Sequence, residues 1–280
     1  METGNDMRGF RYINRTSYPE LKNIRPEEAY DQFIGCGGLY LVVTMIRQMK
    51  LKKGDIVLDL GCGFGPAAVY LAKNFGVTVI AVDLWHSPSK LADRIQGAVY
   101  YDKIIPLNID ITQHMAFAEN YFDAVFCMNS LFLCGNNMDF LKRLLGTLKQ
   151  GGSFCVGSEC FSREPGFKSM EDIPEEFNFN WSWDVWDSCY SKYHSLQWWY
   201  SLLKETKLLD ITYCQELEDG ETLWEDLALN YYRYIGSEIL SMGSVIPQEK
   251  LVRQINYGKS NNLHLTLFVL AGLKKSITIG

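Results

Sequence analysis

The sequence predicts an α/β protein built on a doubly wound sheet that is mostly parallel. Three observations support this prediction: short runs rich in Val, Ile and Leu alternate with helix-like segments, one such run ends in three alternating glycines, and no repeat or linker interrupts the pattern. The chain has 280 residues, a formal net charge of −6 and 47% hydrophobic residues, which suits one large globular domain. This composition disfavours a disulfide scaffold, a disordered protein and a coiled coil.

The first predicted unit is strand, helix, strand. Asp55–Leu60 is a short β-branched and leucine run, and Ala67–Lys73 is a helix-forming segment that follows Pro66, a favourable first-turn residue. Gly76 ends this helix, and Val77–Val82 is the next strand. The order and spacing of these segments predict a βαβ unit.

The same alternation continues along the chain. Asp123–Met128 and Ser153–Gly157 have the pattern of buried strands, and Met138–Leu148 between them carries apolar residues at helical spacing. Leu208–Tyr213 and His264–Ala271 alternate or run apolar as strands do, so we expect them to complete the sheet.

We expect a single domain, 1–280, with distinct segments added to its core. Residues 51–158 form the predicted cofactor-binding core, and the aromatic-rich stretches 159–200 and 217–262 are predicted insertions that cover a substrate. Residues 1–50 are a predicted helical lid. Within it, Tyr30 and Phe33 either close over a ligand or form one face of a helix that packs on the sheet edge.

The glycine turn is the strongest local signal for a ligand. Gly61, Gly63 and Gly65 follow a strand and precede a helix, where the backbone can approach a ligand closely and free N–H groups are presented. The third glycine of a dinucleotide fingerprint would fall at Pro66, and Asp59 would repel a diphosphate. The spacing therefore favours a nucleoside ligand that carries a cationic or zwitterionic group.

Two further acids stand at predicted strand ends. Asp83 lies 18 residues beyond Gly65, where an acid in a nucleotide-binding βαβ unit accepts the ribose hydroxyls. Asp110 lies where the next strand should end, with Ile111 beside it to pack on a base. For either acid, the alternative is a helix cap or a solvated turn residue.

Together these residues resemble the class I S-adenosylmethionine-dependent methyltransferases. The resemblance covers Lys50 to about Val156 and includes the strand Tyr121–Val125 and the turn Leu148–Gly152, in which a glutamine stands where the family has proline. More loosely, the segments from Phe75 to Trp85 and from His194 to Trp199 resemble a bacterial subgroup of small-molecule methyltransferases.

The resemblance implies a Rossmann-like sheet of seven strands, the last one antiparallel, with S-adenosylmethionine as the cofactor. It implies that Asp83 binds the ribose, that Asp110 and Ile111 surround the adenine, and that Asn129 and Ser130 border the transferred methyl group. The expected cofactor-binding residues are Asp59, Gly61, Gly63, Gly65, Asp83, Leu84, Asp110, Ile111 and Asn129.

Catalysis of methyl transfer from a sulfonium depends more on positioning than on acid–base help, because the cofactor supplies the activation. His194 and Glu159 are the candidate general bases: His194 lies within an insertion, and Glu159 directly follows the predicted fifth strand. The alternative for His194 is a partly exposed residue that caps a helix beginning near Ser195.

The acceptor site is expected among aromatic side chains. Tyr30, Trp186, Trp198 and Trp199 are the predicted substrate contacts, and tryptophan faces with carboxylates nearby favour a cationic or aromatic substrate. The alternative for each tryptophan is simple packing of the insertion onto the sheet.

The predicted function is therefore methyl transfer to an N, O or S atom of a small molecule, releasing S-adenosylhomocysteine. Methylation of RNA or protein is one alternative, although the acidic balance argues against a nucleic-acid partner, and a non-catalytic cofactor-binding partner protein is another. We expect a cytoplasmic protein without a membrane segment, because no apolar run approaches ~18 residues, and no metal, because cysteines and histidines are dispersed.

Overall fold

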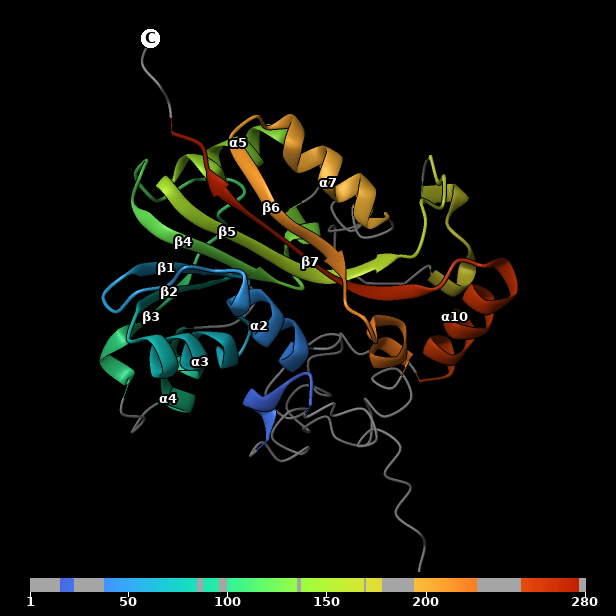
Figure 1. The fold of residues 1–280 in the computed structure, drawn as a ribbon, viewed down its shortest axis with the longest axis horizontal. Coiled ribbons are helices and arrows are strands. Elements are labelled where there is room, and N and C mark those ends of the chain that lie inside the picture. Colours follow the sequence, from blue (N-terminus) through green and yellow to red (C-terminus); the bar gives the residue numbers. More distant parts are fainter. Residues whose placement is uncertain are drawn as a thin grey trace, which may run out of the picture.

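The computed structural model describes residues 16–22, 38–84, 88–95, 100–134, 137–168, 170–177, 194–225 and 248–276. These residues form a seven-stranded sheet with the order β3-β2-β1-β4-β5-β7-β6 (Figure 1). The strands are β1 (Ile56–Leu60), β2 (Thr78–Asp83), β3 (Ile104–Asn108), β4 (Phe122–Met128), β5 (Leu148–Phe161), β6 (Leu209–Glu216) and β7 (Leu265–Lys274). The predicted fold class is confirmed.

Strand direction brings the ends of the parallel strands to one edge. The pairs β1–β2, β2–β3, β1–β4 and β4–β5 are all parallel. Strand β7 is antiparallel to both β5 and β6, so it alone among these seven strands runs against the others. The carboxyl ends of β1, β2, β3, β4 and β5 therefore share an edge, which is where doubly wound sheets bind ligands.

Helices cover both faces of the sheet. Helices α2 (Gly38–Arg47), α3 (Pro66–Phe75) and α4 (Pro88–Ile95) lie on one face, and α5 (Met138–Gly146) and α7 (Leu196–Glu205) lie on the other (Figure 1). Successive strand side chains point to opposite faces, so both sides of a covered strand must be apolar. In β1, Val57 belongs to the core under α2 and α3, whereas Leu58 belongs to the core under α5.

Part of the predicted N-terminal lid is a helix that packs on the sheet. Eight residues of α2 are buried, and the helix contacts β4, β5 and β7. A Cβ atom on Gly157 of β5 would lie 2.7 Å from Met45 Sδ, so this glycine allows the close approach of α2. Tyr30 and Phe33 lie outside the described residues.

The remaining elements lie around this core. Helix α10 (Gln248–Asn261) packs against the short helix η6 (Glu175–Phe177), beyond the ends of the neighbouring strands (Figure 1). The other short helices are η2 (Pro19–Leu21), η3 (Tyr101–Lys103), η4 (Leu131–Cys134) and η5 (Met170–Asp172). Among the described residues, no helix combines the length and the apolarity that a membrane crossing needs.

The end of β5 differs from the prediction. The strand continues to Phe161, because Ser158 to Phe161 pair with β7 beyond the point where β4 ends. The expectation that Glu159 follows the fifth strand is wrong, and the segment 159–200 begins inside the sheet.

Candidate functional site

The glycine turn joins β1 to α3 at the shared edge of the sheet. All three glycines have positive φ, with values of 73° at Gly61, 54° at Gly63 and 78° at Gly65. A Cβ on Gly61 would lie 2.3 Å from Ser130 Cβ, and one on Gly65 would lie 2.2 Å from Leu91 Cδ1. Both backbone conformation and space therefore require glycine at these two positions.

Asp83 ties this turn to the neighbouring strand. Its Oδ2 accepts a hydrogen bond from the Gly63 backbone N–H at 2.9 Å, and the side chain is nearly buried. The Asn108 side-chain amide donates to the carbonyls of Asp83, at 2.9 Å, and Leu84, at 2.7 Å. The ends of β2 and β3 are thus fixed beside the glycine turn, while the Leu84 side chain is 53% exposed.

Asp59 is a buried carboxyl directly beneath the turn. No side chain caps α3 at Gly65, but the Ala68 backbone N–H donates to the Asp59 carboxylate. The other oxygen, Oδ2, has no hydrogen-bond partner within the described part of the chain. Burial, and after it the negative charge of Asp83, raises the pKa of Asp59 to about 7.

This environment suits a cation. A buried carboxyl with an unsatisfied oxygen is stabilised as the carboxylate when a positive charge enters beside it. The glycine turn leaves no room for further side chains, and Asp83 supplies a second acid. The residues present therefore fit a nucleoside ligand with a positively charged group, as the sequence predicted.

The predicted adenine contacts have other neighbours in the structure. Asp110 Oδ1 accepts hydrogen bonds from Thr112 N at 2.9 Å and Thr112 Oγ1 at 2.6 Å, which is the turn role weighed as the alternative. Ile111 is 3% exposed and belongs to the core under α5. Their contacts with a base stay predictions.

Asn129 and Ser130 follow β4 at the same edge. Asn129 has a φ of 53°, and its backbone N–H donates to Gly157 O at 2.8 Å. Ser130 is buried, and its hydroxyl donates to Leu60 O at 2.7 Å. The structure therefore places both residues next to the end of β1, where the glycine turn begins.

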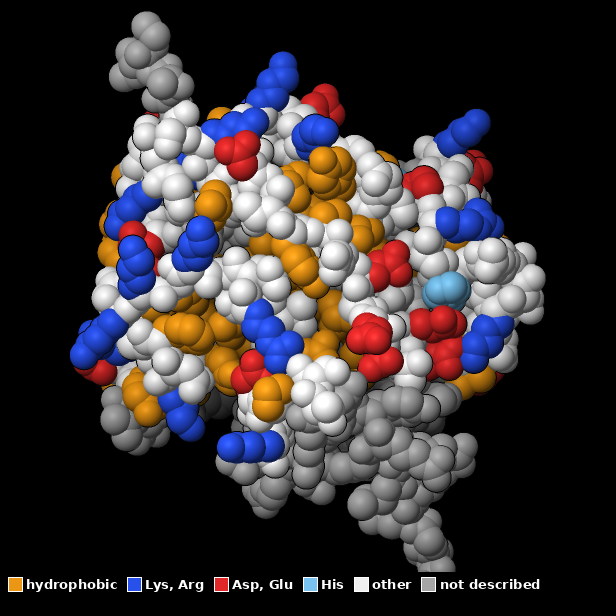
Figure 2. Space-filling model, in the orientation of Figure 1, with side chains coloured by type: hydrophobic (Ala, Val, Ile, Leu, Met, Phe, Trp, Pro, Cys, Tyr) orange, Lys and Arg blue, Asp and Glu red, His pale blue; other side chains and the backbone are white. Residues whose placement is uncertain are grey.

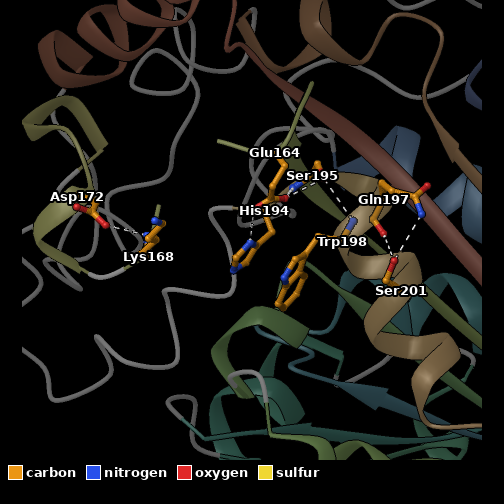
Figure 3. A network of polar contacts seen from close by, with 8 residues as sticks. All are labelled: Glu164, Lys168, Asp172, His194, Ser195, Gln197, Trp198 and Ser201. Atoms are coloured by element: carbon orange, nitrogen blue, oxygen red, sulfur yellow. Dashed lines mark hydrogen bonds and ion pairs between the residues drawn. The ribbon is translucent and has the colours of Figure 1, made fainter. Parts of the chain in front are cut away.

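His194 is held at the start of α7, next to the carboxyl end of β5 (Figure 3). Its Nδ1 lies 2.8 Å from Glu164 Oε1, and its ring stacks on Trp198 with a centroid distance of 3.7 Å and an interplanar angle of 5°. The Phe161 backbone N–H donates to His194 O at 3.1 Å. His194 is 5% exposed, so it is not the partly exposed cap considered as the alternative; Ser195 is the N-cap.

The pKa of His194 lies below its ordinary value. Burial lowers this pKa, and the hydrogen bond and negative charge of Glu164 oppose the effect. The neutral imidazole therefore dominates near pH 7, which is the form that accepts a proton.

The two candidate bases are not brought together. Glu159 Oε2 accepts a hydrogen bond from Trp224 Nε1 at 2.7 Å, and Trp224 belongs to the core under α2. Cys160, the next residue along the strand, belongs to the core on the α7 side, as does Trp198. Side chains alternate along β5, so Glu159 points to the face opposite His194.

The predicted substrate contacts differ in their surroundings. Trp199 is 2% exposed and stacks on Phe268 of β7 at 6.2 Å, so it packs α7 onto the sheet. Trp198 is partly buried beside His194. Tyr30 and Trp186 lie outside the described residues. Within the part of the chain that the structure describes, no three or more His, Cys, Asp or Glu side chains form a group that could hold a metal ion.

Sequence reasoning did not find Glu164. It lies three residues past the end of β5, and its partner His194 is 30 positions away. An acid shortly after a strand end is a common turn residue, so no local pattern distinguishes it.

Comparisons with known proteins match the part of the chain that contains the glycine turn. Residues 58–156 match a family model described as a methyltransferase domain, and this range spans the glycine turn, Asp83 and Asp110. Residues 58–156 are therefore identified as a methyltransferase domain. The prediction of the family is confirmed, and the bacterial subgroup stays a prediction.

The chain is similar to several named proteins. Phosphoethanolamine N-methyltransferase 1 of Arabidopsis thaliana is 26% identical over 166 residues, which cover 59% of this chain and 33% of that protein. The matched part of this chain thus spans about a third of the length of such curated relatives.

Two solved structures share the fold. Phosphoethanolamine N-methyltransferase 2 of Haemonchus contortus, in complex with S-adenosyl-L-methionine, has a TM-score of 0.62 at 19% identity, covering 88% of this chain and 54% of that one. The [4+2]-cyclase SpnF has a TM-score of 0.64 at 15% identity, covering 84% and 81%. Because this fold accompanies more than one activity, the function must be argued from the site.

Proposed function

We propose that this methyltransferase domain binds S-adenosylmethionine and transfers its methyl group to an N, O or S atom of a small molecule, releasing S-adenosylhomocysteine. The observation that carries the proposal is the cradle where β1 and β2 end: a glycine turn with no room for side chains, bordered by the nearly buried Asp83 and the buried Asp59. The cofactor would supply an activated methyl group on a sulfonium.

Each part of the cradle has a proposed partner in the cofactor. The Asp83 carboxylate accepts the ribose hydroxyls, and Leu84, Asp110 and Ile111 lie around the adenine. Gly61, Gly63 and Gly65 contact the methionine portion, where the charge of Asp59 complements a positive group. Asn129 borders the methyl group. The bond from Gly63 N–H to Asp83 supports this arrangement, because it orients the acid toward the turn.

The protein's own residues orient the acceptor and handle its proton. Holding a nucleophile in a near-attack geometry contributes roughly 7–11 kcal/mol, more than a general base adds. We propose that His194 is this base, with Trp198, Trp186 and Tyr30 at the acceptor site. Glu159 is the second candidate, although it points to the other face of β5.

A small amine is the favoured acceptor. Besides the phosphoethanolamine N-methyltransferases, the relatives include a glycine/sarcosine/dimethylglycine N-methyltransferase of Actinopolyspora halophila, which is 28% identical over 112 residues. A tryptophan face attracts a cationic ligand by about 0.5–2 kcal/mol. On the face shown in Figure 2, acidic and basic side chains of the described residues are interspersed, whereas a nucleic acid needs a concentrated basic surface.

Calorimetry and product detection test the proposal. S-adenosylmethionine should bind the purified chain, and Asp83→Ala should weaken binding by roughly ten- to a hundredfold, the worth of a charge-assisted hydrogen bond. Asp83→Asn retains an acceptor for Gly63 N–H and checks that the turn is intact. Asp102→Ala removes an exposed acid in η3 and should leave affinity unchanged.

Turnover is measured as S-adenosylhomocysteine formed with phosphoethanolamine, ethanolamine, glycine and sarcosine. Product above the amine-free background supports methyl transfer to a small molecule. Binding without product would favour the alternative of a non-catalytic partner protein, and unchanged affinity of Asp83→Ala would remove the ribose assignment.

A further inference from the structure

We propose that Glu164 is a positioning residue that holds His194 with its Nε2 as the proton acceptor for methyl transfer. The inference deepens the proposed function and rests on it. It concerns the part of the site that lies outside residues 58–156, the range that matches the methyltransferase domain.

Both oxygens of Glu164 are committed at the start of α7 (Figure 3). Oε1 lies 2.8 Å from His194 Nδ1, and Oε2 accepts from the backbone N–H and the hydroxyl of Ser195, each at 2.9 Å. The two hydrogen bonds from Ser195 fix the carboxylate plane relative to the helix. A fixed carboxylate then fixes the direction of the Nδ1 bond.

Two further contacts hold His194, one at its ring and one at its backbone. Trp198, one turn into α7, stacks face to face on the imidazole at 3.7 Å. The Phe161 N–H holds His194 O at 3.1 Å, which joins this residue to the last position of β5. The imidazole therefore cannot rotate without losing the Trp198 stack or the Glu164 contact.

The carboxylate selects the tautomer. An ionised carboxylate only accepts hydrogen bonds, so Nδ1 of the neutral ring must carry the proton. The lone pair is then on Nε2, the nitrogen that faces away from Glu164. Without this contact, the two neutral tautomers would compete, and part of the population would present an N–H at Nε2.

In the proposed reaction, methyl transfer releases one proton from the acceptor, and His194 receives it. The acceptor atom forms a bond to the methyl carbon while the carbon–sulfur bond breaks, and that electron pair stays on sulfur. The acceptor's proton passes to His194 Nε2, leaving an imidazolium between the Glu164 carboxylate and the Trp198 face. Both partners stabilise a positive charge, and the proton leaves to water before the next turnover.

A purely structural role for Glu164 is the competing explanation, because the same carboxylate accepts two hydrogen bonds from Ser195, the N-cap of α7. The hydrogen bond and the negative charge of Glu164 both raise the pKa of His194. Removing the charge of Glu164 should therefore change the pKa of His194, whereas removing the N-cap of another helix should leave that pKa unchanged. Asn137, the N-cap of α5 on the same face of the sheet, provides the matched control.

The experiment compares wild type, Glu164→Gln, Glu164→Asp and Asn137→Ala in the full chain. Nitrogen NMR of ¹⁵N-histidine-labelled protein should show His194 protonated at Nδ1 in the neutral state. Glu164→Gln should lower the pKa of His194, Glu164→Asp should keep it near the wild-type value, and Asn137→Ala should only lower the melting temperature. An Nε2–H tautomer in the wild type, or a pKa unaffected by Glu164→Gln, would overturn the proposal.

Kinetics with an amine that the turnover assay identifies provide the second readout. Glu164→Gln should lower kcat at least tenfold, within the contribution of a general base, with an unchanged dissociation constant for S-adenosylmethionine. The acidic limb of its kcat profile should move to lower pH, and that of Asn137→Ala should not. A wild-type kcat in Glu164→Gln would refute the positioning role. Absence of turnover in the wild type would instead count against the proposed function. In that case, the NMR result alone would test whether Glu164 sets the tautomer of His194.

Discussion

Asp59→Asn should stabilise the ligand-free protein at pH 8 while it weakens S-adenosylmethionine binding. Asp59 is 2% exposed, and its pKa is raised from 3.8 to about 7, first by burial and second by the charge of Asp83. Asparagine resembles the neutral acid in shape, and its carbonyl can still accept from the Ala68 N–H.

The magnitude follows from the pKa. A shift from 3.8 to about 7 is roughly three units, and each unit is worth about 1.4 kcal/mol, so the ionised buried carboxylate costs about 4 kcal/mol of unfolding free energy. For a chain of this size, that corresponds to a melting-temperature difference on the order of 10 °C.

The sign depends on which state holds the proton. Between pH 4 and pH 7 the folded protein keeps Asp59 protonated, whereas the unfolded chain has lost that proton. The unfolding free energy therefore falls as the pH rises through this window, and the loss is complete above pH 7. Asp59→Asn removes this loss, so its advantage should be small at pH 4 and largest at pH 8.

Thermal unfolding of both proteins at several pH values measures the effect. Asp123→Asn is the opposite control: burial raises the pKa of Asp123, but hydrogen bonds from Ile56 N and Lys149 hold it below its ordinary value. This variant should destabilise at neutral pH, with the deficit vanishing in acid. If Asp59→Asn is no more stable than wild type at pH 8, the carboxylate is not an isolated buried charge.

Binding gives the complementary result for the same variant. A cationic ligand favours ionised Asp59, so wild-type affinity for S-adenosylmethionine should rise with pH up to about 7, with release of a proton. Asp59→Asn should bind more weakly and lose this pH dependence. Calorimetry in buffers of different ionisation enthalpy measures the proton, and a pH-independent wild-type affinity would contradict a cation beside Asp59.

Two other substitutions, each with a control, test the scaffold. Gly65→Ala should lower the unfolding free energy by about 1–2 kcal/mol because of its φ of 78°, lower it further through the contact with Leu91, and weaken cofactor binding. Gly151→Ala is the control: its φ is 72° but the space around it is open, so urea unfolding should show only the loss of about 1–2 kcal/mol that comes from the backbone conformation. Lys274→Met should lower the unfolding free energy by about 2–3 kcal/mol, because the Lys274 ammonium donates to Gly146 O and Leu148 O in a buried setting. The exposed Lys275→Met should lower it by less than about 1 kcal/mol. Equal losses in the two variants would refute this reasoning.

The part of the fold that the sequence predicts best is the part that is buried on both faces. Strands β1, β2 and β4 contain the apolar runs 56–58, 79–82 and 124–128, because helices cover each side of them. The end of β5 was missed, since Cys160 and Phe161 continue the strand through pairing with Thr266 and Leu265 of β7. A partner about a hundred residues away leaves no local pattern.

In the candidate site, too, residues close together in the sequence were predicted, whereas contacts between distant segments were not. Gly61, Gly65 and Asp83 were predicted because strand, turn and helix follow one another within a short stretch of chain. The burial of Asp59 under α3 follows from its strand position, but its raised pKa also depends on Asp83, which only the fold brings near. His194 was predicted from its residue type, and Glu164 was not.

Acceptor specificity depends on a different part of the chain from cofactor binding. The proposed cofactor cradle is made by consecutive elements that lie largely within residues 58–156, the range that matches the methyltransferase domain. The proposed acceptor side is made by the tail of β5, Glu164 and the start of α7, which meet only through long-range contacts. Likeness in the first part therefore places little constraint on the second, as the shared fold of a cyclase illustrates. The acceptor must be inferred from the His194 and Trp198 surroundings, because the glycine turn would serve any acceptor equally well.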